Sequence, residues 1–334
     1  MCEKAPNVAA VMLAHNHVEM TLRALSSVVA TDYPALKVIL VDNGSTDRTA
    51  EFVRRRFMEV EVISTGRNLG TPAGFNFGFK HAYRTADPDY FVTLDNDVII
   101  EDANWLKELV RVAESTGAAA VGPAIIEGKE TENRRLYVKG EARFISFLPY
   151  YLLSTARKAT RKRLATLRVP FETDSLVGAC MLISRKALER EGIYDEGFSP
   201  HGFADGDLCL RFVESGEKVI YDPSVKVRHL GGGTTGKRPF LDARARVKLW
   251  RDHWNPVLFA LSFPFFMLPS PSELRGAPRS FGARIRGIAS GLVAPTIVPT
   301  LEDPRCGLRS SGKHNSLCRF SICRVTTFRV LRKL

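Results

Sequence analysis

Short apolar runs alternate with amphipathic segments over the first hundred residues. The apolar runs of strand length are Val8–Ala14, Lys37–Val41, Val60–Ser64 and Tyr90–Leu94. Apolar positions at helical spacing occupy the segments between them, namely residues 17–30, a segment that begins near Ser45–Asp47, and residues 72–84. Repeated strand and helix units of this length predict an α/β fold with a mostly parallel central sheet flanked by helices.

The pattern becomes irregular after this region and then returns. Residues 127–173 are rich in Arg, Lys and aromatic side chains without a clean period, and we interpret them as an insertion of helices and loops on the acceptor side. Later elements are expected as a strand over Ser175–Ser184, a helix over Asp207–Glu214, and short strands over Lys218–Tyr221 and Val225–His229. We therefore predict one domain over residues 1–238.

The last part of the chain, residues 239–334, differs in character and is predicted to be a helical, basic extension. Residues 240–254 predict a basic and aromatic helix, and Val257–Leu268 is an apolar run that contains Pro264. This run is too short to cross a bilayer, which takes roughly 20 residues. It fits either a segment that lies in a membrane interface or a buried core helix.

Polar side chains follow four of the predicted strands at the point where each strand ends. Asn16 follows the first, Asp42 ends the second, Asn68 follows the third, and Asp95 and Asp97 follow the fourth. Ligands of open α/β sheets bind at the carboxyl ends of the strands. The sequence therefore predicts a ligand site at this edge of the sheet.

The segment Leu94–Val98, with the sequence LDNDV, contains the most informative pair of carboxylates. Two carboxylates held close together repel each other unless a cation lies beside them. A hard divalent ion with phosphate oxygens in its coordination shell meets this need and would neutralise a diphosphate. The alternative is that Asp95 and Asp97 cap the helix that begins near Glu101–Trp105.

The segment VDNGSTD, residues 41–47, contains a second candidate. Asp42, at the end of a buried strand, can accept hydrogen bonds from a base or a ribose, and the small residues after it let backbone amides approach a ligand. A turn followed by a helix cap is the structural alternative, and for Asp47 we favour that role.

These segments as an ordered set resemble the family 2 glycosyltransferases, whose nucleotide-diphospho-sugar transferase fold is called GT-A. The resemblance is carried by AHN, DYPALKVILVDNGSTD, GRNLGTPAGFNFGF and DYFVTLDNDV, and it continues through LVGACMLISRKAL, YDEGF, DGDLCLRFVESGEKVIYDP and VRHLGGG. It covers about residues 8–236. The resemblance implies transfer of a sugar from a nucleotide-diphosphate sugar to a hydroxyl acceptor.

The resemblance also implies roles for single residues. The nucleotide-sugar-binding positions would be Ala14, Asn16, Asp42, Asn68, Asp95, Asn96 and Gly178. Asp97 would bind Mg²⁺ or Mn²⁺ between the two phosphates, and His229 would ligate the metal or touch the diphosphate. Gly178 would leave room for the donor sugar, although a glycine needed for strand packing is an equal alternative.

Asp205 falls on the position of the catalytic base in inverting members of the family. It would deprotonate the acceptor hydroxyl during a single displacement. Family members often carry Glu one residue earlier, where this chain has Ala204. Asp207 is expected to cap the helix that follows. Ala204 keeps one alternative open, a catalytically inactive protein that binds nucleotide sugars or docks on a membrane.

The net charge of +12 favours anionic partners, and half of the excess lies in residues 301–334. A basic tail beside an apolar run suggests docking on an anionic membrane, where lipid-linked acceptors for cell-envelope polysaccharide reside. The chain shows no nucleic-acid recognition module, and AHNHVEM after the first strand does not fit a nucleotidyltransferase loop. Scattered cysteines and the absence of a leader pattern in MCEKAPNVAAVML lead us to expect a cytoplasmic protein, peripheral on the membrane.

Overall fold

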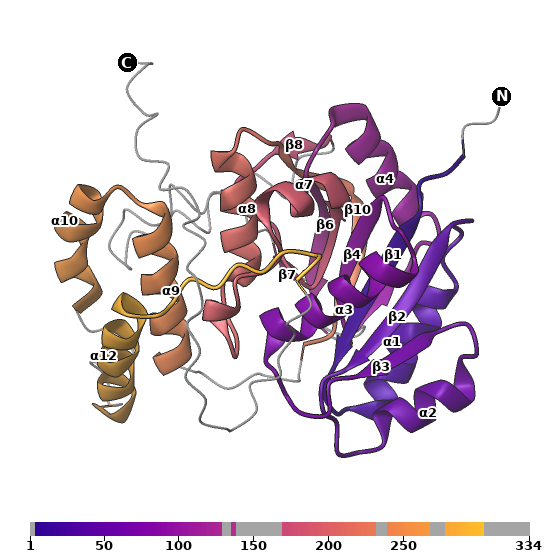
Figure 1. Ribbon diagram of the computed structural model, residues 1–334, viewed down its shortest axis with the longest axis horizontal. Coiled ribbons are helices and arrows are strands. Elements are labelled where there is room, and N and C mark those ends of the chain that lie inside the picture. Colours follow the sequence, from indigo (N-terminus) through magenta and orange to yellow (C-terminus); the bar gives the residue numbers. More distant parts are fainter. Residues whose placement is uncertain (1–3, 129–134, 138–168, 232–238, 268–277, 304–334) are drawn as a thin grey trace.

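A mixed β-sheet of ten strands runs through the part of the chain that the structure describes (Figure 1). The computed structural model describes residues 4–128, 135–137, 169–231, 239–267 and 278–303. The first strands are β1 (Val8–Ala14), β2 (Leu36–Asp42), β3 (Glu61–Ser64), β4 (Tyr90–Asp95) and β5 (Val98–Ile100). The later strands are β6 (Ala120–Glu127), β7 (Arg135–Tyr137), β8 (Phe171–Glu172), β9 (Cys180–Ser184) and β10 (Val219–His229).

The main path of the sheet has the order β3-β2-β1-β4-β9-β6-β10-β5. Strands β3, β2, β1 and β4 pair in parallel, as do β6 and β10, whereas β9 runs antiparallel to both of its neighbours. The expected α/β fold is confirmed. Its parallel pairing is confined to the two groups on either side of β9, so the sheet as a whole is mixed.

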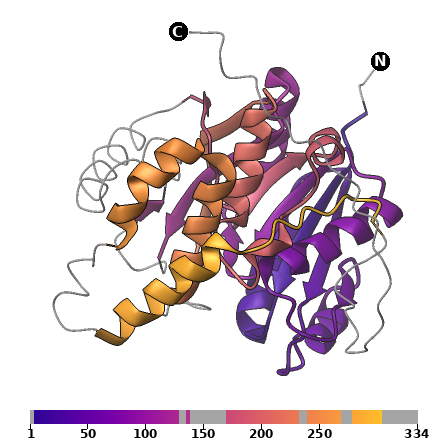
Figure 2. The same ribbon diagram turned by 60° about the vertical axis from the view of Figure 1, so that its left-hand side comes forward.

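Helices cover both faces of this sheet (Figure 2). They are α1 (Val18–Val29), α2 (Thr49–Arg56), α3 (Thr71–Thr85), α4 (Trp105–Thr116), α7 (Arg185–Glu191), the short 3₁₀ helix η1 (Glu196–Phe198) and α8 (Ala204–Glu214). Residues of α1, α2 and α4 share one buried apolar cluster with the sheet, and residues of α3, α7 and α8 share the other. The strict alternation of side chains along a strand explains the division, because Ala10 and Met12 face the first cluster while Ala9 and Val11 face the second.

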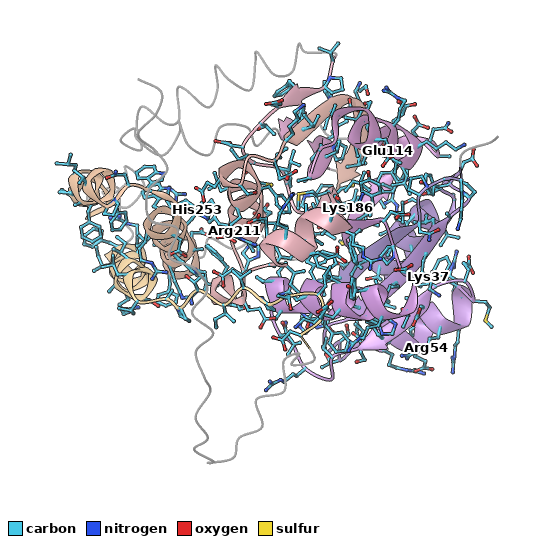
Figure 3. The ribbon with its side chains drawn as sticks, turned by 45° about the horizontal axis from the view of Figure 1, so that its top comes forward. Lys37, Arg54, Glu114, Lys186, Arg211 and His253 are labelled. Atoms are coloured by element: carbon cyan, nitrogen blue, oxygen red, sulfur yellow. The ribbon has the colours of Figure 1, made fainter. Side chains whose placement is uncertain are left out.

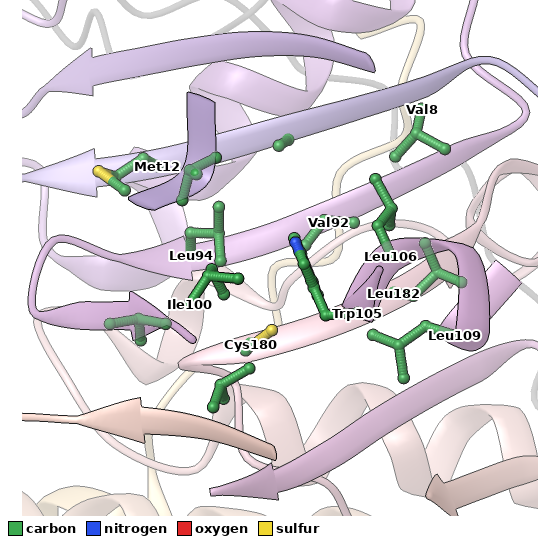
Figure 4. Close-up of a cluster of buried hydrophobic side chains, with 14 of the residues drawn as sticks. Val8, Met12, Val92, Leu94, Ile100, Trp105, Leu106, Leu109, Cys180 and Leu182 are labelled. Atoms are coloured by element: carbon green, nitrogen blue, oxygen red, sulfur yellow. The ribbon is translucent and has the colours of Figure 1, made fainter. Parts of the chain in front are cut away.

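Trp105, the first residue of α4, lies at the centre of the first cluster (Figure 4). Its side chain is almost fully buried, and its indole N–H donates to Thr31 Oγ1 over 2.9 Å. Leu94 and Cys180 reach the same cluster from β4 and β9. Burying a large apolar side chain stabilises a fold by roughly 1.5–3 kcal/mol, so this cluster fixes the strands whose ends carry the polar residues.

Most predicted elements lie where the pattern placed them, and three differ. The strand expected from Ser175 begins only at Cys180, because residues 175–179 turn toward α8. Two expected strands form one, β10, in which the register shifts between Asp222 and Lys226, around Pro223. A proline cannot donate to the ladder, and a bulge accommodates it without ending the strand.

Three further helices lie together at one end of the molecule, beyond α8 (Figure 1). They are α9 (Pro239–His253), α10 (Pro256–Met267) and α12 (Pro278–Leu292). Val257 and Leu261 of α10 are 65% and 67% exposed, so the alternative of a buried core helix for this apolar run is wrong. Within the described residues, none of the helices is both long and apolar enough to cross a bilayer.

A buried ion pair ties these helices to the sheet domain. Lys248 of α9 and Asp195, in the loop before η1, are both fully buried, and their charged groups lie 2.6 Å apart. Lys248 Nζ also donates to Asp252 Oδ2 over 2.5 Å and lies 4.5 Å from the centre of the Phe198 ring. The second carboxylate oxygen of Asp195 accepts from the amides of Gly197 and Ile297. Every charge in this network therefore has partners, as buried charges require.

The predicted acceptor-side insertion, residues 127–173, lies largely outside the described residues. Within it, β7 pairs with β6 and β8 pairs with β10, so both described pieces extend the sheet. The division of the chain at residue 238 remains a prediction.

Candidate active site

The ends of β1, β2 and β4 bring three of the predicted residues to one edge of the sheet. The register places Ala14 beside Asp42, and Leu13 beside Asp95. The carbonyl of Ala14 accepts from the amide of Asn43 over 2.8 Å, which extends the pairing of β1 and β2 to their last residues. The site predicted at the carboxyl ends of the strands therefore has a structural basis.

Asp95, Asp97 and His229 form a cluster at this edge. One potential ligand atom from each residue lies within 4.8 Å of the other two. His229 Nε2 is 3.0 Å from Asp97 Oδ1 and 3.8 Å from Asp95 Oδ2. Strand β10 brings the histidine here, because His229 pairs with Val98 of β5, immediately after the two aspartates. Two carboxylates and an imidazole on one side fit a divalent ion whose remaining positions accept phosphate oxygens.

The alternative role for the two aspartates, capping of α4, is wrong. Helix α4 begins at Trp105, and Asn104 before it makes no side-chain cap. Asp102 instead accepts a hydrogen bond from the amide of Asn104 over 2.9 Å. Asp97 is 8% exposed, and its backbone carbonyl accepts from the amide of Leu230, which holds the end of β10 against it. Both aspartates are thus held at the cluster rather than at the helix.

Asp42 and Asn16 line the neighbouring part of the edge. Asp42 is 6% exposed, and its carboxylate accepts from the amide of Ser45 over 3.0 Å and from Ser64 Oγ over 3.3 Å. Asn16 has a positive φ of 62°, its amide donates to Ser45 Oγ, and its side-chain oxygen accepts from the amide of Thr46. These bonds shape the loops after β1 and β2 as one unit, which is what a nucleotide pocket built from backbone amides requires.

Asp47 has the structural role that we favoured for it. Its carboxylate accepts from the amides of Thr49 and Val18, the first residues of α2 and α1. Burial by itself would raise the pKa of Asp47, but the hydrogen bonds from Thr49 and Val18 outweigh it and hold the pKa below its usual value. One side chain thus caps two helices.

Asn43 is a residue of the site that the sequence analysis missed. It is 3% exposed, its side-chain oxygen accepts from the amide of Leu69, and its amide group donates to Asn68 Oδ1 and to the carbonyl of Gly70. Asn68 in turn accepts from the amide of Gly70 over 2.8 Å. The two asparagines connect the end of β2 to the turn between β3 and α3. The only signal was the position of Asn43 beside Asp42.

Asn96, between the two aspartates, connects their turn to the loop after β1. Its amide group donates to the carbonyl of Asn16 over 3.3 Å and to Thr21 Oγ1 over 2.9 Å. The side chain therefore positions the two loops relative to one another. The ligand contacts that we expected of Asn96, Asn68 and the other residues at this edge remain predictions.

Asp205 is held from two sides at the start of α8. Its Oδ2 accepts from the amide of Gly178 over 3.0 Å, and its Oδ1 from the amide of Gly206 over 2.9 Å. A Cβ on Gly178 would lie 3.0 Å from Cβ of Asp205, so this glycine gives space to the aspartate. Because Gly178 precedes β9 and its close neighbour is Asp205, this contact is not the strand packing that we weighed, and room for the donor sugar remains a prediction.

Tyr194, also missed from the sequence, lies beneath the site. Its side chain is fully buried, and burial, followed by the charge of Asp205 and smaller effects of Cys209 and Asp95, raises the pKa of the phenol well above its usual range. The phenol therefore stays protonated at any working pH.

Asp207 does not cap the helix, and that prediction is wrong. Helix α8 begins three residues before it, at Ala204, and Asp207 is 3% exposed inside the first turn. Its Oδ2 accepts from Arg211 Nε over 3.0 Å, and its Oδ1 lies 2.9 Å from Nε2 of His253, the last residue of α9. Burial alone would raise the pKa of Asp207, but Arg211 and His253 outweigh it and lower the pKa.

His253 is therefore charged at neutral pH. Its side chain is 5% exposed, and its Nδ1 lies 3.0 Å from Glu214 Oε2. Burial lowers its pKa, but the hydrogen bonds to Asp207 and Glu214 prevail and raise the pKa from 6.5 to about 9. Both ring nitrogens face carboxylate oxygens, so both must carry a proton to donate.

The stability that His253 contributes should depend on pH. Because the pKa of His253 is higher in the folded state, its charge stabilises the fold fully below pH 6.5. This stabilisation decreases as the pH rises and is absent above pH 9. The shift corresponds to roughly 3 kcal/mol at most. Urea unfolding of the native protein and of His253→Gln should therefore differ most below pH 6.5 and converge above pH 9. An equal difference at both limits would show that the imidazolium charge is not the stabilising feature.

Comparison with known proteins identifies the family. The family model of glycosyl transferase family 2 matches residues 9–192. The chain is 29% identical over 253 residues to the N-acetylglucosaminyl-diphospho-decaprenol L-rhamnosyltransferase of Mycobacterium tuberculosis. This alignment covers 72% of this chain and 80% of that protein. It is 25% identical to a probable N-acetylgalactosaminyltransferase 7 of Caenorhabditis elegans, over 76% of this chain and 45% of that one.

Two solved structures share the fold. GalNAc-T7 with UDP, GalNAc and Mn²⁺ superposes with a TM-score of 0.60 at 19% identity, over 88% of this chain and 59% of that chain. The mannosyltransferase PcManGT of Pyrobaculum calidifontis, with GDP-Man and Mn²⁺, gives a TM-score of 0.54 at 19% identity. This superposition covers 88% of this chain and 77% of that chain. These relatives are described as transferases, and none of them supports the alternative of an inactive binding protein. The chain belongs to glycosyl transferase family 2 and is a glycosyltransferase with the GT-A fold.

Proposed function

We propose that this glycosyltransferase moves a sugar from a nucleotide-diphosphate donor to a hydroxyl group, with inversion and with a divalent metal. The observation that carries the proposal is the cluster of Asp95, Asp97 and His229 at the ends of β4 and β10. It lies at the same sheet edge as Asp42, whose carboxylate accepts hydrogen bonds from Ser45, after β2, and from Ser64, at the end of β3. A bound Mg²⁺ or Mn²⁺ would supply charge stabilisation for the departing diphosphate, so no acid is required there.

Asp205 is the proposed base. Its carboxylate would take the proton from the acceptor hydroxyl as the hydroxyl oxygen forms a bond to the anomeric carbon. The bond from that carbon to the phosphate oxygen breaks in the same step, and the nucleoside diphosphate leaves on the opposite face. Hydrogen bonds from the amides of Gly178 and Gly206 hold the carboxylate in one orientation. Ala204 is 8% exposed in the apolar cluster, so Asp205 would act without a neighbouring acid at that position.

The acceptor that we propose is a saccharide or a lipid-linked saccharide used in a cell-envelope polysaccharide. The support is the relative from Mycobacterium tuberculosis, whose name describes L-rhamnosyl transfer to a sugar diphosphate on decaprenol. The same name favours a deoxyhexose as the donor sugar. Both solved structures described above contain Mn²⁺, which favours Mn²⁺ as a metal that supports activity here.

A donor panel tests this function. UDP, GDP and dTDP sugars, dTDP-L-rhamnose included, would be incubated with the full chain and Mn²⁺ or Mg²⁺, with and without a polyprenyl-diphosphate-linked N-acetylglucosamine. We expect release of nucleoside diphosphate from one donor, only with metal, and faster with the acceptor. Absence of both binding and turnover for every donor would refute the proposal.

We further propose that the C-terminal helices dock the enzyme on the cytoplasmic face of an anionic membrane, where a lipid-linked acceptor would be presented. Helix α10 has the sequence PVLFALSFPFFM and exposes Val257 and Leu261. Exposed apolar side chains beside a basic segment fit an interface between lipid and water. The excess of Lys and Arg in residues 301–334 adds the attraction to anionic lipid.

Flotation with lipid vesicles tests the docking surface. The native chain should float with vesicles that contain phosphatidylglycerol, and Leu261→Asp should lose most of the bound fraction, because an aspartate at this exposed position cannot enter the lipid. Met58→Asp is the matched control, since Met58 is 88% exposed beside α2, at the opposite end of the molecule (Figure 1). Equal flotation of all three proteins, or none by the native chain, would exclude α10 as the membrane contact.

A further inference from the structure

Helix α8 connects the site to the C-terminal helices. Asp205 lies in its first turn, and Asp207 and Glu214 lie toward its two ends on the side that meets α9. Figure 3 shows Arg211 and His253 close together at this boundary. Both α8 and α9 lie beyond residue 192, where the match to the family model ends. Asp205 and the side chains of α8 and α9 around it therefore come from a part of the chain that the family match does not cover, whereas Gly178, whose amide donates to the carboxylate, lies within the match.

Arg211 joins α8 to the loop that carries Tyr194. Its Nε donates to Asp207, its Nη1 to the carbonyl of Glu191 over 2.6 Å, and its Nη2 to the carbonyl of Ile193 over 2.7 Å. The next residue is Tyr194, whose phenol feels the charges of Asp205 and Asp95. A shift of Asp207 would release the guanidinium and move both α8 and this loop.

His253 holds the other side of the same carboxylate. One ring nitrogen contacts Asp207 at the start of α8 and the other contacts Glu214 at its end, so a single side chain spans the helix. The stacking of Trp250 on Trp254, with ring centres 5.1 Å apart and an angle of 9°, fixes the end of α9 around it. Without His253, Arg211 would be the one side-chain partner of Asp207 among the residues that the structure describes, and a buried carboxylate with too few partners is costly.

We propose that His253 is a positioning residue for Asp205: by bridging Asp207 and Glu214 it fixes the orientation of α8, and with it the carboxylate that activates the acceptor. The inference rests on the proposed role of Asp205. It makes the C-terminal helices part of the catalytic unit in addition to any membrane contact. Donor and metal are held at the ends of β1, β2, β4 and β10, which His253 does not touch, so loss of the bridge should affect turnover and leave donor binding intact.

The test compares His253→Gln with the native enzyme in the transfer assay. A glutamine is neutral and cannot donate to both carboxylates, so we expect kcat to fall at least tenfold while the donor KM and the affinity for UDP, GDP or dTDP with Mn²⁺ change less than threefold. His81→Gln is the matched control, because His81 also contacts a carboxylate, Glu61, but lies on α3 away from α8. It should keep native kcat.

A second variant guards against simple unfolding. Glu214 is 39% exposed, so Glu214→Gln weakens the bridge with little risk to the fold, and kcat should fall about threefold at unchanged donor KM. The inference is overturned if both variants keep native kcat, or if kcat and nucleotide affinity fall together in proportion to the folded fraction. Asp205→Asn in the same assay separates the two proposals. A native kcat in Asp205→Asn would refute the role of Asp205 itself. A reduced kcat in Asp205→Asn together with a native kcat in His253→Gln would refute only the positioning role of His253.

Discussion

Replacing Asp97 with alanine should abolish metal-dependent turnover. Asp97 lies 3.0 Å from His229 and within the cluster that includes Asp95, so its loss removes a carboxylate from the proposed metal site and leaves the imidazole without its nearest partner. A metal that stabilises a leaving diphosphate contributes several kcal/mol to the transition state. Since about 1.4 kcal/mol corresponds to a factor of ten, we expect kcat/KM to fall about a thousandfold or more.

The measurement is turnover of the selected donor over a titration of Mn²⁺, together with Mn²⁺-dependent binding of the nucleoside diphosphate. Both should be lost in Asp97→Ala. Asp102→Ala is the control, because Asp102 is an exposed aspartate close by in sequence whose carboxylate accepts from the amide of Asn104, just before α4. Native turnover in Asp97→Ala at low Mn²⁺ would remove Asp97 from the metal site.

Asp205→Asn should separate catalysis from binding. An asparagine keeps one oxygen that can accept from the amide of Gly178, loses the acceptor for the amide of Gly206, and cannot take a proton from the acceptor hydroxyl. A positioned general base contributes about a hundredfold to ten-thousandfold in rate, and kcat for transfer should fall within that range. Affinity for the nucleoside diphosphate with Mn²⁺ should stay native, which is the opposite of the pattern expected for Asp97→Ala.

Asp242→Asn controls for the chemical change, since Asp242 is an exposed aspartate in the first turn of α9. Transfer by Asp205→Asn at more than a tenth of the native rate would assign the base to another group.

The sequence was most informative where one physical signal dominated. Strands β1, β2 and β4 are apolar on both sides because helices cover both faces of the sheet, so their limits and the polar residues that end β2 and β4, Asp42 and Asp95, could be predicted. The likeness of the ordered motifs to a known family then gave the activity. Neither inference required knowledge of contacts between distant residues.

The missed features depend on such contacts. Asp207 was expected to cap a helix, but it lies inside the first turn of α8 and pairs with Arg211 and with His253, which is 46 positions away. Tyr194 resembles any buried aromatic residue, and only the folded structure shows that burial and the charge of Asp205 raise the pKa of its phenol. Two strands were predicted on either side of residues 222–224, whereas a register shift absorbs this segment, which contains Pro223, within β10. In each case tertiary packing, which local pattern does not encode, decided the outcome.

The buried pair of Lys248 and Asp195 has a practical consequence for how this enzyme is dissected. A fragment that ends near residue 238 would contain the recognised sequence motifs but would leave Asp195 without its lysine and Asp207 without His253. Removing one partner of a buried ion pair costs roughly 3–5 kcal/mol, which is comparable with the whole stability of many domains. Expression of the catalytic unit should therefore extend at least through residue 303, since Ile297 and Pro299 also hydrogen-bond back to the loop around Asp195.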